Sequence, residues 1–264
     1  MLKLLKYEWK ACARTCLPLY GALLLMAIVN HIMYYGGAST LLNGIPSALV
    51  TMLYFGIMVA VFVVTTVILV QRFYKNLLGS EGYLMFTLPV TVSQHILSKT
   101  VIATAMTLLG CIAAALSIGI VSGGFKAFVG VGDLLKAFVQ QPIAIVFALE
   151  LLLLAVLAIA GIALFVYLCI ALGHLAKKHR LLMAIVWYFV LSTALQFAML
   201  LVLMGGGNVL PASFLAVMRA MWNGITPEGA MHLFLLCGSA AALIGDVVYF
   251  FATRWILEHK LNLE

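Results

Sequence analysis

Six long apolar runs dominate the sequence, and each is long enough to cross a lipid bilayer. They occupy residues 17–35, 48–70, 100–121, 181–204 and 230–252, and one more lies within 143–172. About 20 consecutive apolar residues in a helix cross the hydrocarbon core. Only 9% of the 264 residues are charged, against roughly 25% in a soluble domain. The sequence therefore predicts an all-α integral membrane protein, with residues 1–264 forming a single transmembrane domain of six helices.

Lys and Arg residues are shared unequally between the two sets of predicted loops. Residues 1–16, 71–99, 173–180 and 253–264 hold twelve of the fifteen, and Lys126, Lys136 and Arg219 are the other three. Loops rich in Lys and Arg stay on the cytoplasmic side of a membrane. We therefore expect a multi-pass protein of the cell membrane with both termini in the cytoplasm. The positive charges are scattered over separate loops without a stacking platform, so nucleic acid is not an expected partner.

Two further segments are expected to lie along the membrane surface. Residues 1–16 combine apolar side chains at helical spacing with four basic ones, which predicts an amphipathic elbow helix before the first span. A cleaved signal peptide ending near residues 36–38 is the alternative. Residues 205–229 open with three glycines and continue with an apolar helical face. They predict a surface or re-entrant helix on the outer side.

No motif for catalysis or nucleotide binding appears in the chain. It lacks His-Glu-x-x-His and Gly-x-x-x-x-Gly-Lys-Ser/Thr, so we expect neither an enzyme nor a metal or ATP site in this subunit. His174 and His179 are predicted to be solvated loop side chains. Within the spans, Glu150 and Asp246 stand out, because an ionised group there costs roughly 2.5–3.5 kcal/mol. Each predicts either a polar lining or proton relay, or a snorkelling or internally hydrogen-bonded side chain. Their positions in opposite leaflets argue against a shared-proton pair.

The most informative polar stretch is residues 71–99, QRFYKNLLGSEGYLMFTLPVTVSQHILSK, between the second and third spans. Ser80 is predicted to cap a short helix with Glu81 in its first turn, and Pro89 to stop it. Residues 91–94, TVSQ, predict a capping box that starts the third span. A short helix held between two spans transmits force to both. The alternative is an interfacial linker without a partner.

This stretch also carries a family resemblance. SEGYLMFTLPVTVSQHILSK resembles the cytoplasmic coupling region of ATP-binding-cassette type-2 exporter permeases, and MLKLLKYEWK and LNLE, at the two ends of the sequence, resemble permeases of this family in Gram-positive bacteria. The resemblance implies an elbow at residues 1–16, coupling between the second and third spans, and re-entrant outer helices between the fifth and sixth.

The same resemblance implies the partners and the contact residues. The chain would be the membrane subunit of an exporter of amphiphilic substrates, such as antimicrobial peptides, drugs or lipid-like molecules. It would pair with a second permease chain, identical or related, and with separate subunits that hold ATP and Mg²⁺. The implied contact residues are Glu81, Gly82, Tyr83, Leu84, Phe86, Thr87, Leu88 and Pro89. The segment departs from the family in its charge, since Glu81 is the only charged residue between Ser80 and Gln94.

Two other functions remain open from the sequence. The first is a proton-coupled secondary transporter that uses Glu150 or Asp246, although no inverted repeat is visible in its support. The second is a membrane immunity or sensor subunit that binds a peptide at the outer loops and transports nothing.

Overall fold

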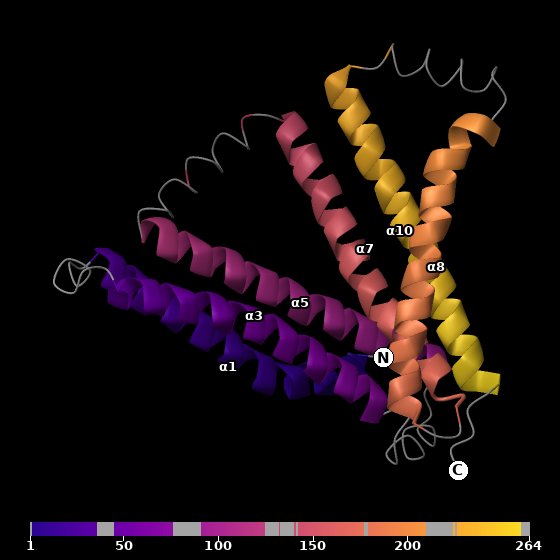
Figure 1. Ribbon diagram of the computed structural model, residues 1–264, viewed down its shortest axis with the longest axis horizontal. Helices are drawn as coiled ribbons and strands as arrows, with labels where there is room; N and C mark the ends of the chain where they lie inside the picture. The colour runs from indigo at the N-terminus through magenta and orange to yellow at the C-terminus, as the bar shows by residue number, and fades with distance from the viewer. Residues whose placement is uncertain are drawn as a thin grey trace. The chain divides into compact units, whose positions relative to one another are not determined.

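The computed structural model describes residues 2–35, 45–75, 91–124, 132, 140, 142–176, 179–209, 224 and 226–259. Six helices account for nearly all of them (Figure 1): α1 (Leu2–Tyr35), α3 (Ile45–Phe73), α5 (Val92–Gly123), α7 (Pro142–Gly173), α8 (Arg180–Val209) and α10 (Pro227–His259). Each is long and apolar enough to cross a membrane. Over the described residues, the prediction of an all-α fold with six potential spans is therefore confirmed.

The first helix differs from the sequence-based prediction. α1 runs unbroken for 34 residues through Pro18, so a separate elbow helix over residues 1–16 is not shown. At about 1.5 Å per residue α1 is about 51 Å long, whereas the hydrocarbon core is only about 30 Å thick. Roughly 20 Å of the helix therefore continues beyond the thickness that needs to be spanned.

The outer segment predicted over residues 205–229 is covered only in part. Residues 205–209 continue α8, and residues 227–229 begin α10. Residues 210–223 and 225 lie outside the described part of the chain, so the surface or re-entrant helix stays a prediction.

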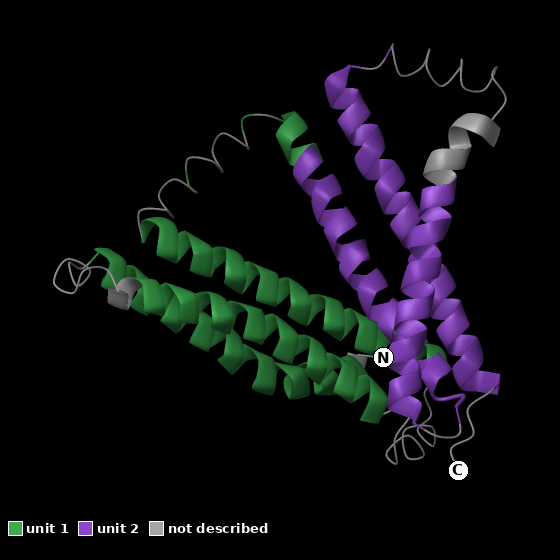
Figure 2. Ribbon diagram, in the orientation of Figure 1, with its two compact units in different colours: residues 1–146 green, residues 147–264 purple. Residues whose placement is uncertain are grey.

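The chain divides into two compact units, residues 1–146 and residues 147–264 (Figure 2). In the first unit α1, α3 and α5 pack on one another. Cross-helix contacts fix their directions: Tyr20 of α1 meets Thr65 of α3 and Met106 of α5, while Asn30, further along α1, meets Thr51, earlier in α3. α3 is therefore antiparallel to α1. α5 is parallel to α1, because Tyr35, later in α1, meets Ser122, later in α5. The end of α3 and the start of α5 consequently lie at the end of this unit where α1 begins.

Tyr20 of α1 forms hydrogen bonds with both other helices of the first unit. Its hydroxyl donates to the Met106 carbonyl at 2.9 Å and accepts from the Thr65 hydroxyl at 3.4 Å. Gly110 makes room for the ring, because a Cβ there would lie 3.3 Å from the ring atoms. This contact places the close-packing face of α5 on Gly110 and the buried Ala114.

A stripe of small residues on α5 lies beside the face of this helix that packs on α1 and α3. Residues 111, 115, 119 and 123 repeat every four positions, yet Cys111 and Ala115 are exposed. The buried small residues of α5 in this region are Gly110, Ala113, Ala114 and Ser117. The helix is turned so that this neighbouring stripe faces α1 and α3.

Where α1 ends and α5 ends, a second set of contacts joins the two helices. The Tyr35 hydroxyl donates to the Ser122 carbonyl at 3.1 Å. Gly124, which follows α5, has a φ of 58° and lies directly against the His31 ring. A side chain at this position would meet both a strained backbone and that ring, so Gly124 allows α5 to end against α1.

In the second unit, α7 from Phe147 onward packs with α8 and α10. Glu150 meets His232 near the start of α7 and α10, and Leu168 and Ile256 share an apolar cluster further along both. α7 and α10 are therefore parallel. Phe165 of α7 meets Tyr188 of α8 with ring centroids 5.6 Å apart, and Gly173, later in α7, lies against Ala184, earlier in α8. α8 is therefore antiparallel to α7.

The turn from α7 into α8 depends on a close backbone approach. A Cβ on Gly173 would lie 2.6 Å from the backbone nitrogen of Ala184. Such a distance leaves no room for any side chain, so Gly173 lets the end of α7 press against the first turns of α8. Beyond this contact α7 and α8 present mostly apolar, exposed faces, as expected of lipid-facing helices.

Candidate functional site

The predicted coupling residues fall between two described helices. Glu81, Gly82, Tyr83, Leu84, Phe86, Thr87, Leu88 and Pro89 lie outside the described residues. The chain is described up to Lys75 and again from Thr91. Thr91 is extended, with φ −72° and ψ 152°, and α5 begins at Val92 as the sequence predicted. The predicted capping box is wrong in one respect, because the Thr91 side chain makes no capping hydrogen bond.

The described ends of this segment meet at one carboxylate, that of Glu8. Lys99 Nζ donates to Glu8 Oε1 at 2.8 Å, and Arg72 Nη2 donates to Glu8 Oε2 at 3.1 Å. The exposed fractions of the side chains are 8% for Glu8, 4% for Lys99 and 27% for Arg72. We call these three residues the Glu8 cluster. It joins α1 to the last turn of α3 and to the second turn of α5.

The helical spacing of α1 explains why Glu8 is buried. Cys12, Cys16 and Tyr20 follow it at intervals of four residues, and all are buried on the face that packs on α3 and α5. Each oxygen of the carboxylate receives one charged donor, which is the arrangement that makes a buried ion cluster tolerable.

Sequence reasoning counted Arg72 and Lys99 as loop charges that set orientation, and it missed Glu8. A signal was present in the sequence. Glu8 is one of only eight acidic residues in the chain and shares the helical face of Cys12 and Cys16. An acid on the apolar face of a helix implies a basic partner from another segment.

Glu150, one of the two acidic residues singled out within the spans, has a partner inside the chain. Its Oε2 lies 2.8 Å from Nδ1 of His232. The His232 ring also stacks on Phe147, with centroids 3.8 Å apart and planes 5° from parallel. Glu150 is thus an internally hydrogen-bonded side chain, one of the alternatives that its sequence position left open.

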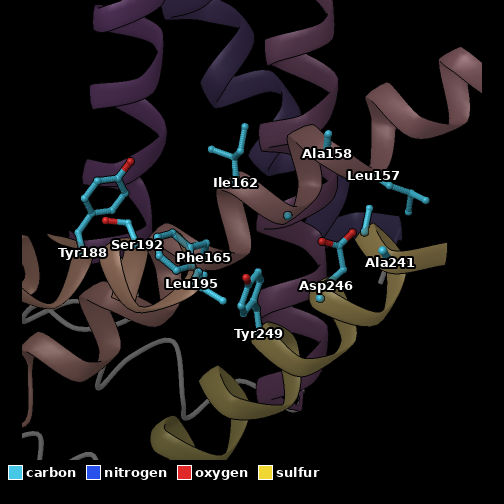
Figure 3. Close-up of a pocket in the computed structure, with 13 residues that line it drawn as sticks. Leu157, Ala158, Ile162, Phe165, Tyr188, Ser192, Leu195, Ala241, Asp246 and Tyr249 are labelled. Carbon is cyan, nitrogen blue, oxygen red and sulfur yellow. The ribbon is translucent and has the colours of Figure 1, made fainter. Parts of the chain in front are cut away.

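Asp246 has a different environment, at a pocket of about 410 Å³ between α7, α8 and α10 (Figure 3). Most of the lining is apolar. Asp246 is the only charged residue among the described residues that line it. Within the described ranges, no side chain donates a hydrogen bond to its carboxylate or pairs with it, in contrast to Glu150.

Gly161 gives the Asp246 carboxylate its position. A Cβ built on Gly161 would lie 2.5 Å from Asp246 Oδ1, so the carboxylate rests against the bare backbone of α7. Even an alanine at position 161 would displace it. Sequence reasoning selected Asp246 but not Gly161, because nothing local to residue 161 shows that α10 approaches it.

The two acidic residues occupy different levels of the second unit. On α7, Glu150 and Gly161 are eleven residues apart, and on α10, His232 and Asp246 are fourteen apart. At about 1.5 Å per residue these separations are about 16 and 21 Å. Glu150 and Asp246 therefore do not share a proton, as their sequence positions had indicated.

His174, in the connection between α7 and α8, is less exposed than the sequence predicted. Burial, and in second place the guanidinium charge of Arg180, hold the pKa of His174 below its usual range. His179 is exposed, as expected, and adopts a φ of 55°. Across the described ranges, no three His, Cys, Asp or Glu side chains come together as a metal site would require.

Comparisons with known proteins give no relative from which a role for these residues could be taken. No protein-family model, no curated protein and no solved structure matches the chain. The Glu8 cluster and the Asp246 pocket are thus the two sites that its own geometry defines.

Proposed function

We propose that the chain is the membrane-spanning permease subunit of an ATP-driven exporter in the cell membrane, with both termini in the cytoplasm. Six helices that could cross a membrane and the resemblance of residues 80–99 to a coupling region support this proposal. The observation that carries it is the Glu8 cluster, which ties α1 to the described ends of the segment connecting α3 and α5.

The Glu8 cluster supplies a route for force. A partner that pushes on residues 80–89 displaces the end of α3 and the start of α5, to which those residues are covalently joined. Arg72 and Lys99 both hold Glu8, so the displacement also moves α1. α1 is one continuous helix, and a helix that long carries movement at one end to the other. The three helices of the first unit thus respond together.

In this proposal, ATP and Mg²⁺ are held by separate subunits. Glu81 would make the polar contact with such a subunit, and Tyr83, Leu84 and Phe86 would be the apolar anchors, as aromatic side chains are at many interfaces. A second permease chain, identical or related, would complete the path for an amphiphilic substrate. The exposed apolar faces of α7 and α8 leave surface for this chain and for lipid.

The test is purification of the tagged chain from its native membrane. We expect an ATP-hydrolysing subunit to accompany it, and to be lost when Glu81 and Phe86 are both changed to alanine. The matched control changes Glu228 and Phe251 to alanine, because it removes the same two residue types from described, exposed positions of α10. Recovery of the wild-type chain alone, with transport that needs no ATP, would refute the proposal.

A proton-coupled secondary transporter is the second candidate, and one observation favours Asp246 over Glu150 for it. Glu150 already has His232 as a partner, whereas no described residue pairs with Asp246. This candidate predicts uptake or efflux driven by a pH gradient in vesicles that contain only this chain. The flux should stop in Asp246→Asn and continue in Glu150→Gln.

A further inference from the structure

We propose that the Asp246 pocket binds a hydrophobic organic cation carrying a single positive charge. The claim that this cation is the exported substrate rests on the proposed export function. The claim that the pocket binds such a cation concerns this chain alone and is tested without any ATP-hydrolysing partner.

The size and lining of the pocket fit such a ligand. Its volume is about 410 Å³, within the roughly 300–1,000 Å³ of small-molecule sites. Apolar side chains of α7 and α10 form most of the wall, and Ser192 and two tyrosines are the other polar residues on it. Apolar walls with a few placed polar groups favour a mainly hydrophobic ligand.

The charge of the pocket selects the sign of the ligand. A carboxylate among apolar side chains is unstable as an ion unless a positive charge compensates it. For Glu150 the chain provides His232 at 2.8 Å. For Asp246 the described residues provide no such partner, so either a proton or the occupant of the pocket has to neutralise its charge. A cationic occupant does this without protonation of the carboxylate. An anion would be repelled, and a neutral molecule would leave the carboxylate uncompensated.

Aromatic rings add a second reason for a cation. Phe165 lies between Tyr188 and Tyr249, with ring centroids 5.6 and 5.4 Å away, and all three residues line the pocket (Figure 3). The rings come from α7, α8 and α10. Ring faces attract a cation within about 6 Å, more strongly where water is excluded. A bulky cation can therefore contact the rings and Asp246 together.

Gly161 completes the site by fixing where the negative charge sits. Because the carboxylate fills the space that a Cβ would take, its distance from the rings is set by the backbone of α7. A methyl group at position 161 would move the charge without removing any lining group. This gives a variant that tests position separately from chemistry.

The probe is tetraphenylphosphonium, a rigid monovalent cation, and its control is tetraphenylborate, which has nearly the same shape and the opposite charge. Binding is measured by equilibrium dialysis on the full chain in phosphatidylcholine nanodiscs, with empty nanodiscs as the background. We expect saturable binding of one phosphonium per chain and none of the borate. Asp246→Asn should weaken phosphonium binding about tenfold or more. Glu150→Gln, the matched carboxylate control, should bind like the wild type.

Two further measurements keep the test decisive if Asp246→Asn folds poorly. Gly161→Ala should weaken phosphonium binding several-fold, whereas Gly21→Ala, a glycine with open space around it in the first unit, should not. The phosphonium should also raise the melting temperature of the wild type more than that of either pocket variant. Equal binding by the wild type and both pocket variants overturns the proposal, and so does the absence of saturable binding. If saturable binding is absent and a pH gradient drives flux, the proton is the occupant of the pocket.

Failure here and failure of the exporter proposal can be told apart. If the wild-type chain binds no phosphonium but still co-purifies with an ATP-hydrolysing subunit, only the pocket assignment is overturned. Phosphonium binding by a chain that never co-purifies with such a subunit would overturn only ATP-driven export.

Discussion

Lys99 Nζ lies 2.8 Å from Oε1 of Glu8, although the two residues are 91 positions apart in the chain. Arg72 takes the other carboxylate oxygen at 3.1 Å. One buried acid thereby sets the relative position of three helix ends. The ion cluster replaces the apolar packing that holds the rest of the first unit, at the end where the unit continues into residues 76–90.

Glu8→Gln should destabilise the protein by roughly 3 kcal/mol, at the low end for breaking a buried pair, because Lys99 is left buried without its counter-ion. We expect a loss of stability near the lower limit for a buried ion pair, because Arg72, the second partner of Glu8, is partly exposed and screened by solvent. The change is measured as the shift of the unfolding midpoint in detergent micelles.

The control for that variant is Glu258→Gln. Glu258 pairs with Arg254 at 2.7 Å, and the exposed fractions of the two side chains are 30% and 42%, against 8% for Glu8 and 4% for Lys99. Its loss should cost less than about 1 kcal/mol. Equal losses in the two variants would contradict the burial argument. The double variant Glu8→Gln/Lys99→Met should lose less than the sum of its single changes.

Gly173→Ala should separate α7 from α8 and cost about 1–3 kcal/mol, the usual range for forcing extra volume into a packed contact. The clash is with the backbone of Ala184, which cannot rotate away as a side chain would. Gly21→Ala is the control, because nothing lies within 4 Å of its Cβ position. It should be neutral or stabilising by up to about 1 kcal/mol, since alanine favours helix. Thermal unfolding of both variants in the same detergent makes the comparison.

His232→Phe should cost about 1–3 kcal/mol, because it leaves Glu150 without its hydrogen-bond partner. The new ring can still stack on Phe147, so the change isolates the polar contact. Adding Glu150→Leu should recover most of the loss, because no unpaired acid then remains. A double variant as unstable as His232→Phe alone would show that an unpaired Glu150 is not the cause of the loss. Unfolding midpoints of the two single variants and the double variant decide between these outcomes.

His174 should make stability depend on pH in the mildly acidic range. Its pKa is lowered in the folded chain by burial and by Arg180, so below the ordinary value of 6.5 the unfolded chain binds the proton more readily. The stability that neutral, buried His174 contributes is fully present above pH 6.5 and is lost as the pH falls through its lowered pKa. His174→Gln should therefore flatten the drop in melting temperature between pH 7.5 and 5.5. An identical drop in His174→Gln and wild type would assign the pH dependence to other groups.

The sequence predicted the six helices but not where they end. Hydrophobicity locates a span because it measures transfer into lipid, and it says nothing about a helix that continues into polar surroundings. α1 and α5 extend past their apolar cores through Glu8 and Lys99, which satisfy each other across the helix interface. The charge count that predicted orientation treated Arg72 and Lys99 as free loop charges, because a pairing over such a distance in sequence has no local sign.

The same limit applies to the second unit. Glu150 and Asp246 look alike in the sequence, since each is a lone acid in an apolar run. They differ only in what α7 and α10 place opposite them. His232 is 82 positions from Glu150, and Gly161 is 85 positions from Asp246. Parallel packing of the fourth and sixth spans decides both environments, and that register is a tertiary property.

The separation of Glu8 from its partners along the sequence has a consequence for biosynthesis. A ribosome adds about 5–20 residues per second, so Lys99 is made roughly 5–18 s after Glu8, which it will meet 91 positions later. Arg72, which is 64 positions from Glu8, is made before Lys99, and until then α1 carries an unpaired acid on the face that will later be buried. The Glu8 carboxylate therefore has to stay in contact with water until α3 and then α5 supply its partners.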